Sequence, residues 1–239
     1  MHGFANPARF LRIARWLTPT LLLSGLVMTG AALAWGLTGL PAERLQGDSV
    51  RVVLVHVPTA WLGMAGWSAI AAASLTELVW RHPLAAIAAR AAAAPGAAFA
   101  AMCLATGSLW GRPAWGTWWV WDGRLTSMLV LLFLYFGYMA LAAAVDREGG
   151  SSRIPAIFGL VGAINIPIIH YSVIWWNSLH QAPSLSMGAS AMAPAFLIPL
   201  AAATLGFSLL FGGVVLARMR ALLAEVQAEA RLRRKALEA

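Results

Sequence analysis

The chain has 239 residues, of which 60% are hydrophobic and only 11% are charged, and its mean hydropathy is +0.73. Soluble globular domains carry about 25% charged residues, so this composition excludes a single soluble domain and indicates an integral membrane protein. The net charge of +8 does not require a nucleic-acid partner, because basic residues are also expected beside anionic membrane lipid.

Six apolar stretches predict six transmembrane helices, since about 20 helical residues cross the roughly 30 Å of hydrocarbon in a bilayer. In chain order they span residues 18–40, 53–79, 91–109, 125–145, 154–176 and 191–217. The first stretch exceeds the core of a usual signal peptide and is therefore interpreted as a membrane span. We expect an all-α integral membrane protein in which residues 1–217 form a single membrane domain, built as a six-transmembrane-helix bundle.

The second predicted helix begins near His56, which lies five residues after Arg51. The third predicted helix is rich in Ala and Gly, so its backbone can approach neighbouring helices closely. The only cysteine of the chain, Cys103, lies midway along this third helix and is interpreted as a small packing residue. A single cysteine excludes Cys-ligated metal sites.

The stretch WGTWWVWDGRLTS, residues 115–127, begins in the segment between the third and fourth helices, residues 110–124. If this segment is helical, Trp115, Trp118, Trp119 and Asp122 share one face and form a short outer amphipathic element along the membrane boundary. An aromatic belt at the interface is the simpler explanation of the tryptophans. Their density also favours a platform for a large, flat, apolar ligand. The aspartate has a structural alternative, which is to cap the fourth helix.

The fifth predicted helix contains Pro167, which is expected to kink it, and His170, which is interpreted as a core histidine. His180 follows the end of this helix. It is therefore expected near the outer surface, at the level of His56 and the tryptophans.

The last predicted helix leads into a basic tail, residues 218–239, which is expected to be helical and cytoplasmic. Basic loops resist translocation across the membrane. If the N-terminus is cytoplasmic, 13 of the 17 Lys and Arg residues lie on the cytoplasmic side and four lie outside. Both termini are therefore expected in the cytoplasm, with the tail near anionic lipid or a cytoplasmic partner.

Neutral imidazoles bind haem iron axially, so His56 and His180 together could hold a porphyrin beside the tryptophans. Zinc is a weaker alternative, because zinc sites use three or four protein ligands. Haem propionates are anionic, and the outer residues Arg51 and Arg124 are expected to pair with them. A structural role for each of these residues remains open at this stage.

The stretch WGTWWVWDGRLTS resembles the tryptophan-rich WWD signature of haem-handling proteins in cytochrome c maturation. Together with HVPTAWLGM at the start of the second helix and IIHYSVIWWNSLHQ at the end of the fifth, it resembles the family of cytochrome c maturation protein C, also called haem exporter protein C. The resemblance covers the six spans, and the tail beyond about residue 220 is expected to lie outside it.

The resemblance implies that the protein binds haem as non-covalent, b-type cargo at the periplasmic face of the bacterial inner membrane. It implies delivery of that haem to a membrane-anchored periplasmic haem chaperone. The implied partners are an ABC-type ATPase, a second permease subunit and a small single-span helper. The chain has no G-x-x-x-x-G-K-[ST] motif, so ATP hydrolysis is expected in a partner and the chain itself is not expected to be an enzyme.

The resemblance also implies a set of haem-binding residues. The axial ligands would be His56 and His180. The other haem-binding residues would be Arg51, Trp115, Trp118, Trp119, Trp121, Asp122 and Arg124. Gly123 stands where the signature is expected to have Ala, and this difference is expected to be harmless.

Three alternatives to haem transfer remain. A b-type cytochrome subunit would carry electrons through the membrane, with ligands deep within its spans. A permease for another solute would carry polar residues at mid-membrane. An intramembrane protease would pair a serine with His170, but no motif supports it.

Overall fold

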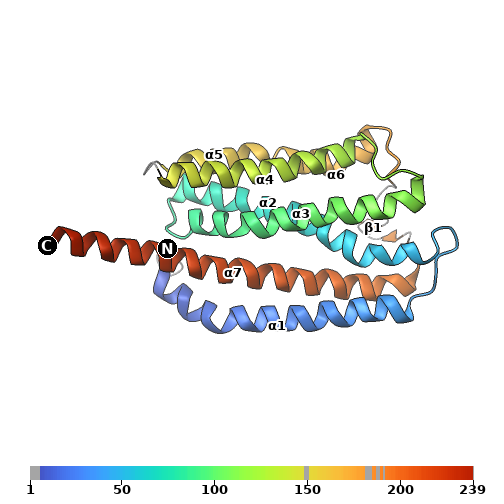
Figure 1. Ribbon diagram of the computed structural model, residues 1–239, viewed down its shortest axis with the longest axis horizontal. Coiled ribbons are helices and arrows are strands. Elements are labelled where there is room, and N and C mark those ends of the chain that lie inside the picture. The colour runs from blue at the N-terminus through green and yellow to red at the C-terminus, as the bar shows by residue number, and fades with distance from the viewer. Residues whose placement is uncertain (1–5, 148–150, 181–184, 187–188, 191, 239) are drawn as a thin grey trace.

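The computed structural model describes residues 6–147, 151–180, 185–186, 189–190 and 192–238. Within these residues, six helical segments are long and apolar enough to cross a membrane, and they lie side by side in one bundle (Figure 1). The predicted all-α membrane fold with six spans is therefore confirmed.

The elements follow the chain without a soluble domain between them in the described residues. The helices are α1 (Pro7–Gly39), the 3-10 helix η1 (Asp48–Val52), α2 (Val53–Trp80), α3 (Ala85–Trp115), α4 (Gly123–Arg147), α5 (Arg153–Gly162), α6 (Asn165–Trp175) and α7 (Pro194–Glu238). Two short strands, β1 (Leu185–Ser186) and β2 (Ala189–Ser190), pair in antiparallel orientation before α7.

Several helices extend beyond the apolar stretches that predicted them, and α1 shows why. Asn6 accepts a hydrogen bond at 2.9 Å from the backbone N–H of Ala8, and Pro7 occupies the first helical position. An Asn cap followed by Pro is a strong start signal for a helix. As a result α1 begins 11 residues before the apolar stretch, and hydropathy alone misses its polar first turns.

The fifth span is divided into α5 and α6 by a break at residues 163–164. Pro167 has no N–H, so it cannot bond to the carbonyl of Ala163 four residues earlier. That carbonyl instead accepts from the backbone N–H of Ile166 at 3.1 Å. The expected distortion at Pro167 is therefore confirmed, and it takes the form of an interruption one turn before the proline.

Small residues let α2 and α3 pack with their backbones close together. A Cβ atom added to Gly66 would lie 3.0 Å from Cα of Gly96, and one added to Gly63 would lie 3.2 Å from Cα of Ala100. Such close approach is a main source of helix association in lipid. The Ala-rich and Gly-rich third span therefore acts as a packing surface, as the sequence predicted.

The centre of the bundle contains Trp67, which is fully buried. Its Nε1–H donates to the carbonyl of Gly159 at 3.1 Å, and its ring meets the edge of Tyr135 at 5.0 Å between centroids. The Tyr135 hydroxyl in turn donates to the carbonyl of Gly63 at 2.7 Å. These contacts join α2, α4 and α5 and satisfy the polar atoms that they bury.

The two ends of the bundle differ. At one end α1 begins and α7 continues past the other helices (Figure 1). At the other end α2 begins, α3 ends, α4 begins and α6 ends (Figure 1). This second end, here named the site end, brings together the segments that carry the predicted site residues.

Candidate functional site

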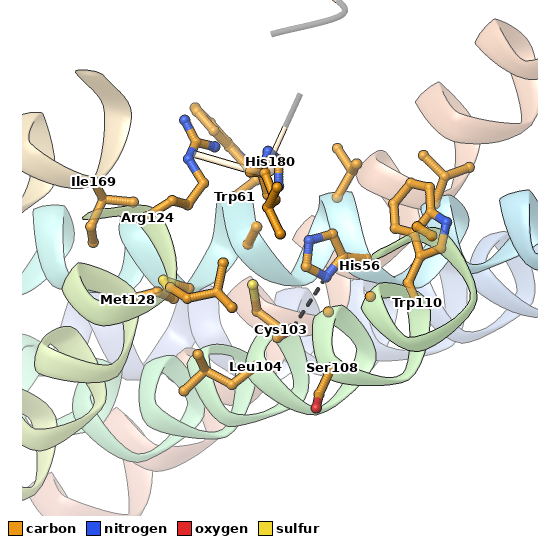
Figure 2. Close-up of a pocket in the computed structure, with 18 of the residues that line it drawn as sticks. His56, Trp61, Cys103, Leu104, Ser108, Trp110, Arg124, Met128, Ile169 and His180 are labelled. Atoms are coloured by element: carbon orange, nitrogen blue, oxygen red, sulfur yellow. Dashed lines mark hydrogen bonds between the residues drawn. The ribbon is translucent and has the colours of Figure 1, made fainter. Parts of the chain in front are cut away.

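A cavity of about 420 Å³ lies between α2, α3, α4 and α6 at the site end (Figure 2). Small-molecule sites usually measure about 300–1,000 Å³, so the cavity has the size of a ligand site. Five of the predicted site residues line it, namely His56, Trp115, Trp119, Arg124 and His180. Its remaining walls are mainly apolar and include side chains of Met64, Leu104 and Met128.

His56 and His180 lie close together in this cavity, although 124 positions separate them in the sequence. Their ring centroids are 6.3 Å apart and their planes are inclined by 35°. Figure 2 shows both side chains at the same cavity, with His180 beside His56. The structure therefore brings the two predicted ligands together from α2 and from the segment after α6.

The His56 ring is held against α3. Its Nδ1 lies 3.1 Å from the carbonyl oxygen of Cys103 and 3.2 Å from Oγ1 of Thr106. A carbonyl oxygen only accepts hydrogen bonds, so Nδ1 carries the proton and Nε2 keeps its lone pair. The ring also has a close neighbour in Gly107, where an added Cβ would lie 2.8 Å from Cε1 of His56. The α3 backbone thus sets both the tautomer and the position of this imidazole.

His180 lies beyond α6, in a segment tied to the start of α4. Its backbone N–H donates to Oγ of Ser178 at 3.0 Å. The Ser178 hydroxyl donates to Oδ2 of Asp122. The His180 ring lies 6.2 Å from the ring of Trp115.

The tryptophan-rich segment is not the amphipathic helix considered from its spacing. α3 ends at Trp115, where Gly116 adopts φ of +77° and its N–H bonds to the carbonyl of Arg112 at 3.0 Å. A glycine in this left-handed conformation is a common helix terminator. Residues 116–122 are non-helical, so the expected common face is wrong.

The tryptophans instead divide between the cavity and the surface. Trp115 and Trp119 line the cavity, whereas Trp118 is 53% exposed and Trp121 is 75% exposed. The Nε1 atom of Trp119 is buried and has no hydrogen-bond partner among the described residues. Trp118 lies beside Arg112, whose guanidinium carbon is 6.0 Å from the ring centroid.

Asp122 caps α4, as the structural alternative proposed. It is 8% exposed, and its Oδ1 accepts from the backbone N–H of Leu125 at 2.8 Å. This is the usual bond of a helix N-cap. Asp122 is not among the residues that line the cavity.

Arg124, in the first turn of α4, lines the cavity and reaches across to α6. Its Nε donates to Oγ of Ser172 at 3.3 Å and one terminal nitrogen donates to the carbonyl of His170 at 3.1 Å. The other terminal nitrogen stays available in this geometry for an anionic group in the cavity.

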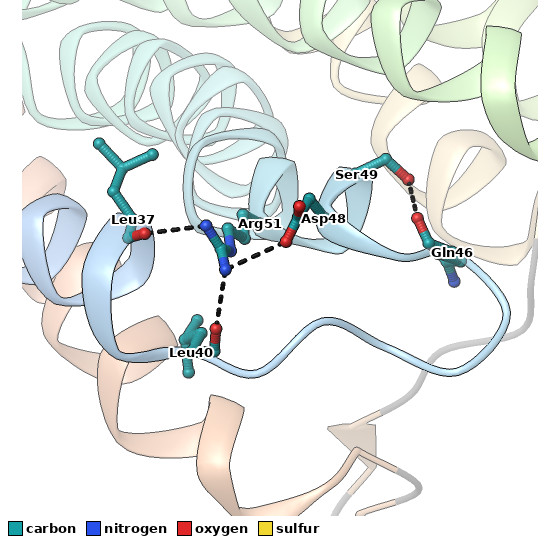
Figure 3. A network of polar contacts seen from close by, with 6 residues as sticks. All are labelled: Leu37, Leu40, Gln46, Asp48, Ser49 and Arg51. Atoms are coloured by element: carbon teal, nitrogen blue, oxygen red, sulfur yellow. Dashed lines mark hydrogen bonds and ion pairs between the residues drawn. The ribbon is translucent and has the colours of Figure 1, made fainter.

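Arg51 has a different environment from the one expected (Figure 3). Its terminal nitrogens donate to the carbonyls of Leu37 at 2.8 Å and Leu40 at 3.0 Å, and it pairs with Asp48 at 3.1 Å. These carbonyls lie at the C-terminus of α1, where a cation is favoured. Arg51 is not among the lining residues, so the structure does not bring it to the histidine pair.

His170 is exposed at the edge of the cavity, and its interpretation as a core histidine is wrong. Its ring packs edge-on against Tyr171, with centroids 4.8 Å apart. The break before Pro167 interrupts the helix that was assumed to carry His170, so the simple extension of one span misplaces its side chain.

Sequence reasoning left out two residues that help to form the cavity. Trp110 packs against the His56 ring at 5.7 Å in an edge-on arrangement and donates from Nε1 to Oε1 of Gln46 at 2.7 Å. Trp110 was visible as part of the dense tryptophan block. Gln46 lies in the loop after α1 and has no local signal, because its role depends on the fold.

Gly123 lies against the ring of Trp176. A Cβ added there would lie 2.8 Å from Cε3 of Trp176. Alanine at this position would therefore require the Trp176 ring, which is 50% exposed, to shift.

The side chains of the cavity suit a metal complex that already has most of its ligands better than a bare metal ion. In the described part of the chain, no group of three or more His, Cys, Asp or Glu side chains could hold a metal ion. Protein zinc sites use three or four such ligands. Two facing imidazoles suit a macrocyclic metal complex, which needs only axial ligands.

The fold and the cavity define a multi-pass helical membrane protein with a paired-histidine, tryptophan-lined ligand site at one end of its bundle. Comparison with known proteins identifies the family. Residues 1–234 match the family CcmC, described as Heme exporter protein C, and the chain belongs to this family. The match includes most of the tail beyond residue 220, so the expectation that the tail lies outside the resemblance is wrong.

Individual relatives agree over nearly the whole chain. A Heme exporter protein C from Bradyrhizobium diazoefficiens is 50% identical over 222 residues, which cover 90% of this chain and 82% of the relative. One from Escherichia coli K12 is 43% identical over 223 residues, covering 93% and 90%. One from Rhodobacter capsulatus is 37% identical over 237 residues, covering 98% and 96%.

Proposed function

We propose that this protein is the haem-handling membrane component of an exporter that supplies haem for c-type cytochrome biogenesis. In this proposal it binds haem as cargo between His56 and His180, on the periplasmic side of the bacterial inner membrane, and passes it to a periplasmic haem chaperone. The observation that carries the proposal is the approach of the two imidazoles in one cavity, at 6.3 Å between centroids.

That distance fits axial ligation of one metal ion. Metal–imidazole bonds are about 2.0–2.1 Å long, and each ring centroid lies about 1 Å behind its nitrogen, so two axial rings have centroids about 6 Å apart. The 35° inclination of the ring planes is compatible with two imidazoles whose planes both contain the axis through the metal. The hydrogen bond from Nδ1 of His56 leaves Nε2 as the ligating atom.

The rest of the cavity suits a flat, apolar ring with an anionic edge. Trp110, Trp115 and Trp119 offer aromatic surface beside the histidines. Arg124 lies where it can pair with a carboxylate, and it is half-buried, which strengthens such a pair. Arg51 is left with a structural role at the end of α1 in this arrangement.

The distribution of basic residues supports a periplasmic location of the cavity. The site end carries Arg51, Arg112 and Arg124, with Arg44 in the loop before them, whereas the other 13 Lys and Arg residues lie toward the opposite end. Cytoplasmic segments are the ones enriched in Lys and Arg. In this orientation both termini are cytoplasmic, and residues 218–239 form a basic cytoplasmic helical tail of the membrane domain at residues 1–217.

The chain is proposed to act by positioning its cargo rather than by acid-base or nucleophilic chemistry. His56 and His180 orient the iron, the tryptophans hold the ring, and Arg124 sets which edge faces water. Because the sequence lacks a P-loop, an ABC-type ATPase partner would supply ATP hydrolysis, with a second permease subunit and a small single-span helper completing the assembly. Its action would reach this cavity through conformational coupling.

Absorbance spectroscopy of the purified protein tests the proposal. The wild-type protein titrated with haemin is expected to give a six-coordinate, low-spin spectrum. His56→Ala and His180→Ala are each expected to lose that spectrum and to weaken binding by about 10- to 100-fold. The matched control is His82→Ala, because His82 lies in the turn between α2 and α3 at the opposite end of the bundle. Wild-type spectra and affinities in both cavity variants would overturn the assignment.

A further inference from the structure

The signature aspartate, Asp122, has two partners that connect α4 to the His180 segment. Its Oδ1 accepts from the N–H of Leu125 at 2.8 Å, which fixes the carboxylate to the first turn of α4. Its Oδ2 accepts the hydroxyl proton of Ser178. The carboxylate is buried, and Asp122 is not among the residues that line the cavity.

Ser178 passes this connection on to His180. Its hydroxyl gives its one proton to Asp122, and its oxygen accepts the backbone N–H of His180 at 3.0 Å. A hydroxyl has one donor and two acceptor positions, so both bonds form together. The bond to an ionised carboxylate is charge-assisted and therefore stronger than a neutral one.

The residues after Asp122 reinforce the same junction. Gly123 packs against the Trp176 ring so closely that an added Cβ would lie 2.8 Å from Cε3. Arg124 bonds to Ser172 and to the carbonyl of His170. Three consecutive residues, the cap Asp122 and the first two residues of α4, thus hold the end of α6 and the segment that leads to His180.

We propose that Asp122 is a positioning residue, which acts through Ser178 to hold His180 at the distance required for axial ligation, rather than a residue that contacts haem. We name the Asp122–Ser178–His180 connection the latch. This inference rests on the proposed function, because it assigns a role within the same ligand site. It predicts that loss of the latch loosens the iron–His180 bond while His56, held by α3, stays in place.

The central test compares Ser178→Ala with Ser178→Thr in the purified full-length protein. Ser178→Ala removes the link and leaves the cap between Asp122 and Leu125 intact. It is expected to shift bound haemin partly to a high-spin spectrum and to speed haemin dissociation about fivefold, the effect of one lost hydrogen bond. Added imidazole should restore the low-spin spectrum by occupying the loosened position. Ser178→Thr retains a hydroxyl and is expected to behave as wild type.

Asp122→Ala completes a double-mutant cycle. It is expected to cause the same spectral shift, and the double variant with Ser178→Ala should match it within about twofold, because both changes break one connection. The matched control is Ser208→Ala, which removes a serine hydroxyl bonded to the carbonyl of Thr204 within α7 and not connected to His180. Its spectrum and dissociation rate should equal those of wild type.

The outcomes separate the latch from the proposed function. A wild-type spectrum and dissociation rate in Ser178→Ala, with a changed spectrum in Asp122→Ala and in His180→Ala, would overturn the latch and favour direct contact between Asp122 and haem. If Asp122→Ala changes the melting temperature but neither Asp122→Ala nor Ser178→Ala changes the spectrum, then Asp122 acts only as a helix cap and the latch is overturned. A wild-type spectrum in both His56→Ala and His180→Ala would instead overturn the ligand site itself.

Discussion

Gly107 offers the sharpest test of how α3 sets the position of His56, the proposed ligand. A Cβ added at Gly107 would lie 2.8 Å from Cε1 and 3.4 Å from Nδ1 of His56. Ordinary contacts of a Cβ atom begin at 3.4 Å, so the imidazole has to withdraw by about 0.6 Å, the difference between the two distances. Metal–ligand bonds tolerate only about 0.2 Å, so the Gly107→Ala variant is expected to misplace this ligand.

The expected size of the effect follows from the role of such supporting groups. Disturbing the surroundings of a metal ligand usually lowers affinity about 10- to 100-fold, and this range is expected for haemin binding to Gly107→Ala. The clash with His56 also costs folding free energy, and this offsets the about 0.5–1 kcal/mol by which Ala is favoured over Gly inside a helix. The melting temperature is therefore expected to change little, so a loss of haemin affinity would report ligand geometry rather than unfolding.

The assay is a haemin titration followed by absorbance, with thermal unfolding measured on the same samples. Gly30→Ala is the matched control, because it makes the same exchange within α1 and an added Cβ there meets no atom within 4 Å. Gly30→Ala should bind haemin as wild type does. If Gly107→Ala also shows the wild-type spectrum and affinity, then the α3 backbone does not determine the position of His56 and the reasoning is wrong.

Two further predictions concern charge and packing. Arg124→Gln is expected to weaken binding of haemin about tenfold and to leave binding of haemin dimethyl ester nearly unchanged. Arg51→Gln should affect neither titration. Equal losses of haemin affinity in both variants would show that Arg51 also contacts the ligand. Tyr135→Phe removes the hydroxyl bonded to Gly63 and should lower the free energy of unfolding by about 1 kcal/mol, measured by denaturant titration in detergent, without altering the haemin spectrum.

The six spans could be predicted because the signal for a membrane helix is local. Roughly 20 consecutive apolar residues satisfy the length of the bilayer wherever the helix packs. The break before Pro167 had a local cause as well, the missing N–H. The polar first turns of α1 could be predicted only from Asn6 and Pro7, which together signal a helix start. A hydropathy profile does not include this signal.

The site was predictable in part. His56 and His180 were placed at one end by counting spans and by resemblance, and the structure brings them within 6.3 Å. The conformation of the tryptophan segment was not predicted, although Gly116 directly after Trp115 carried the signal of a helix end. The predicted common face of the tryptophans and Asp122 assumed a continuous helix. Gly116, with its positive φ, ends the helix and so removes that face.

The sequence did not predict the polar contacts between residues far apart in the chain. Arg51 looked like an outer cation available to a ligand, but its terminal nitrogens are bonded to the carbonyls at the end of α1 and to Asp48. Asp122 and Ser178 are 56 positions apart, and no periodicity joins them. Such bonds depend on which helix ends become neighbours, and this is determined only when the bundle packs.

The two proposed ligands are anchored in different ways, and this difference predicts which iron–histidine bond opens first in the proposed haem transfer. His56 lies within α2 and bonds to the backbone of α3, and these helices pack through small residues at close range. The backbone of His56 therefore moves away from α3 only if two closely packed helices separate. His180 lies beyond the end of α6, and its latch joins it to α4 through a single hydroxyl. Breaking hydrogen bonds costs far less than separating packed helices, so in the proposed transfer to a chaperone we expect the iron–His180 bond to open first. Stopped-flow transfer experiments test this order, because Ser178→Ala should then speed haem loss more than Thr106→Val, which removes one of the contacts of His56.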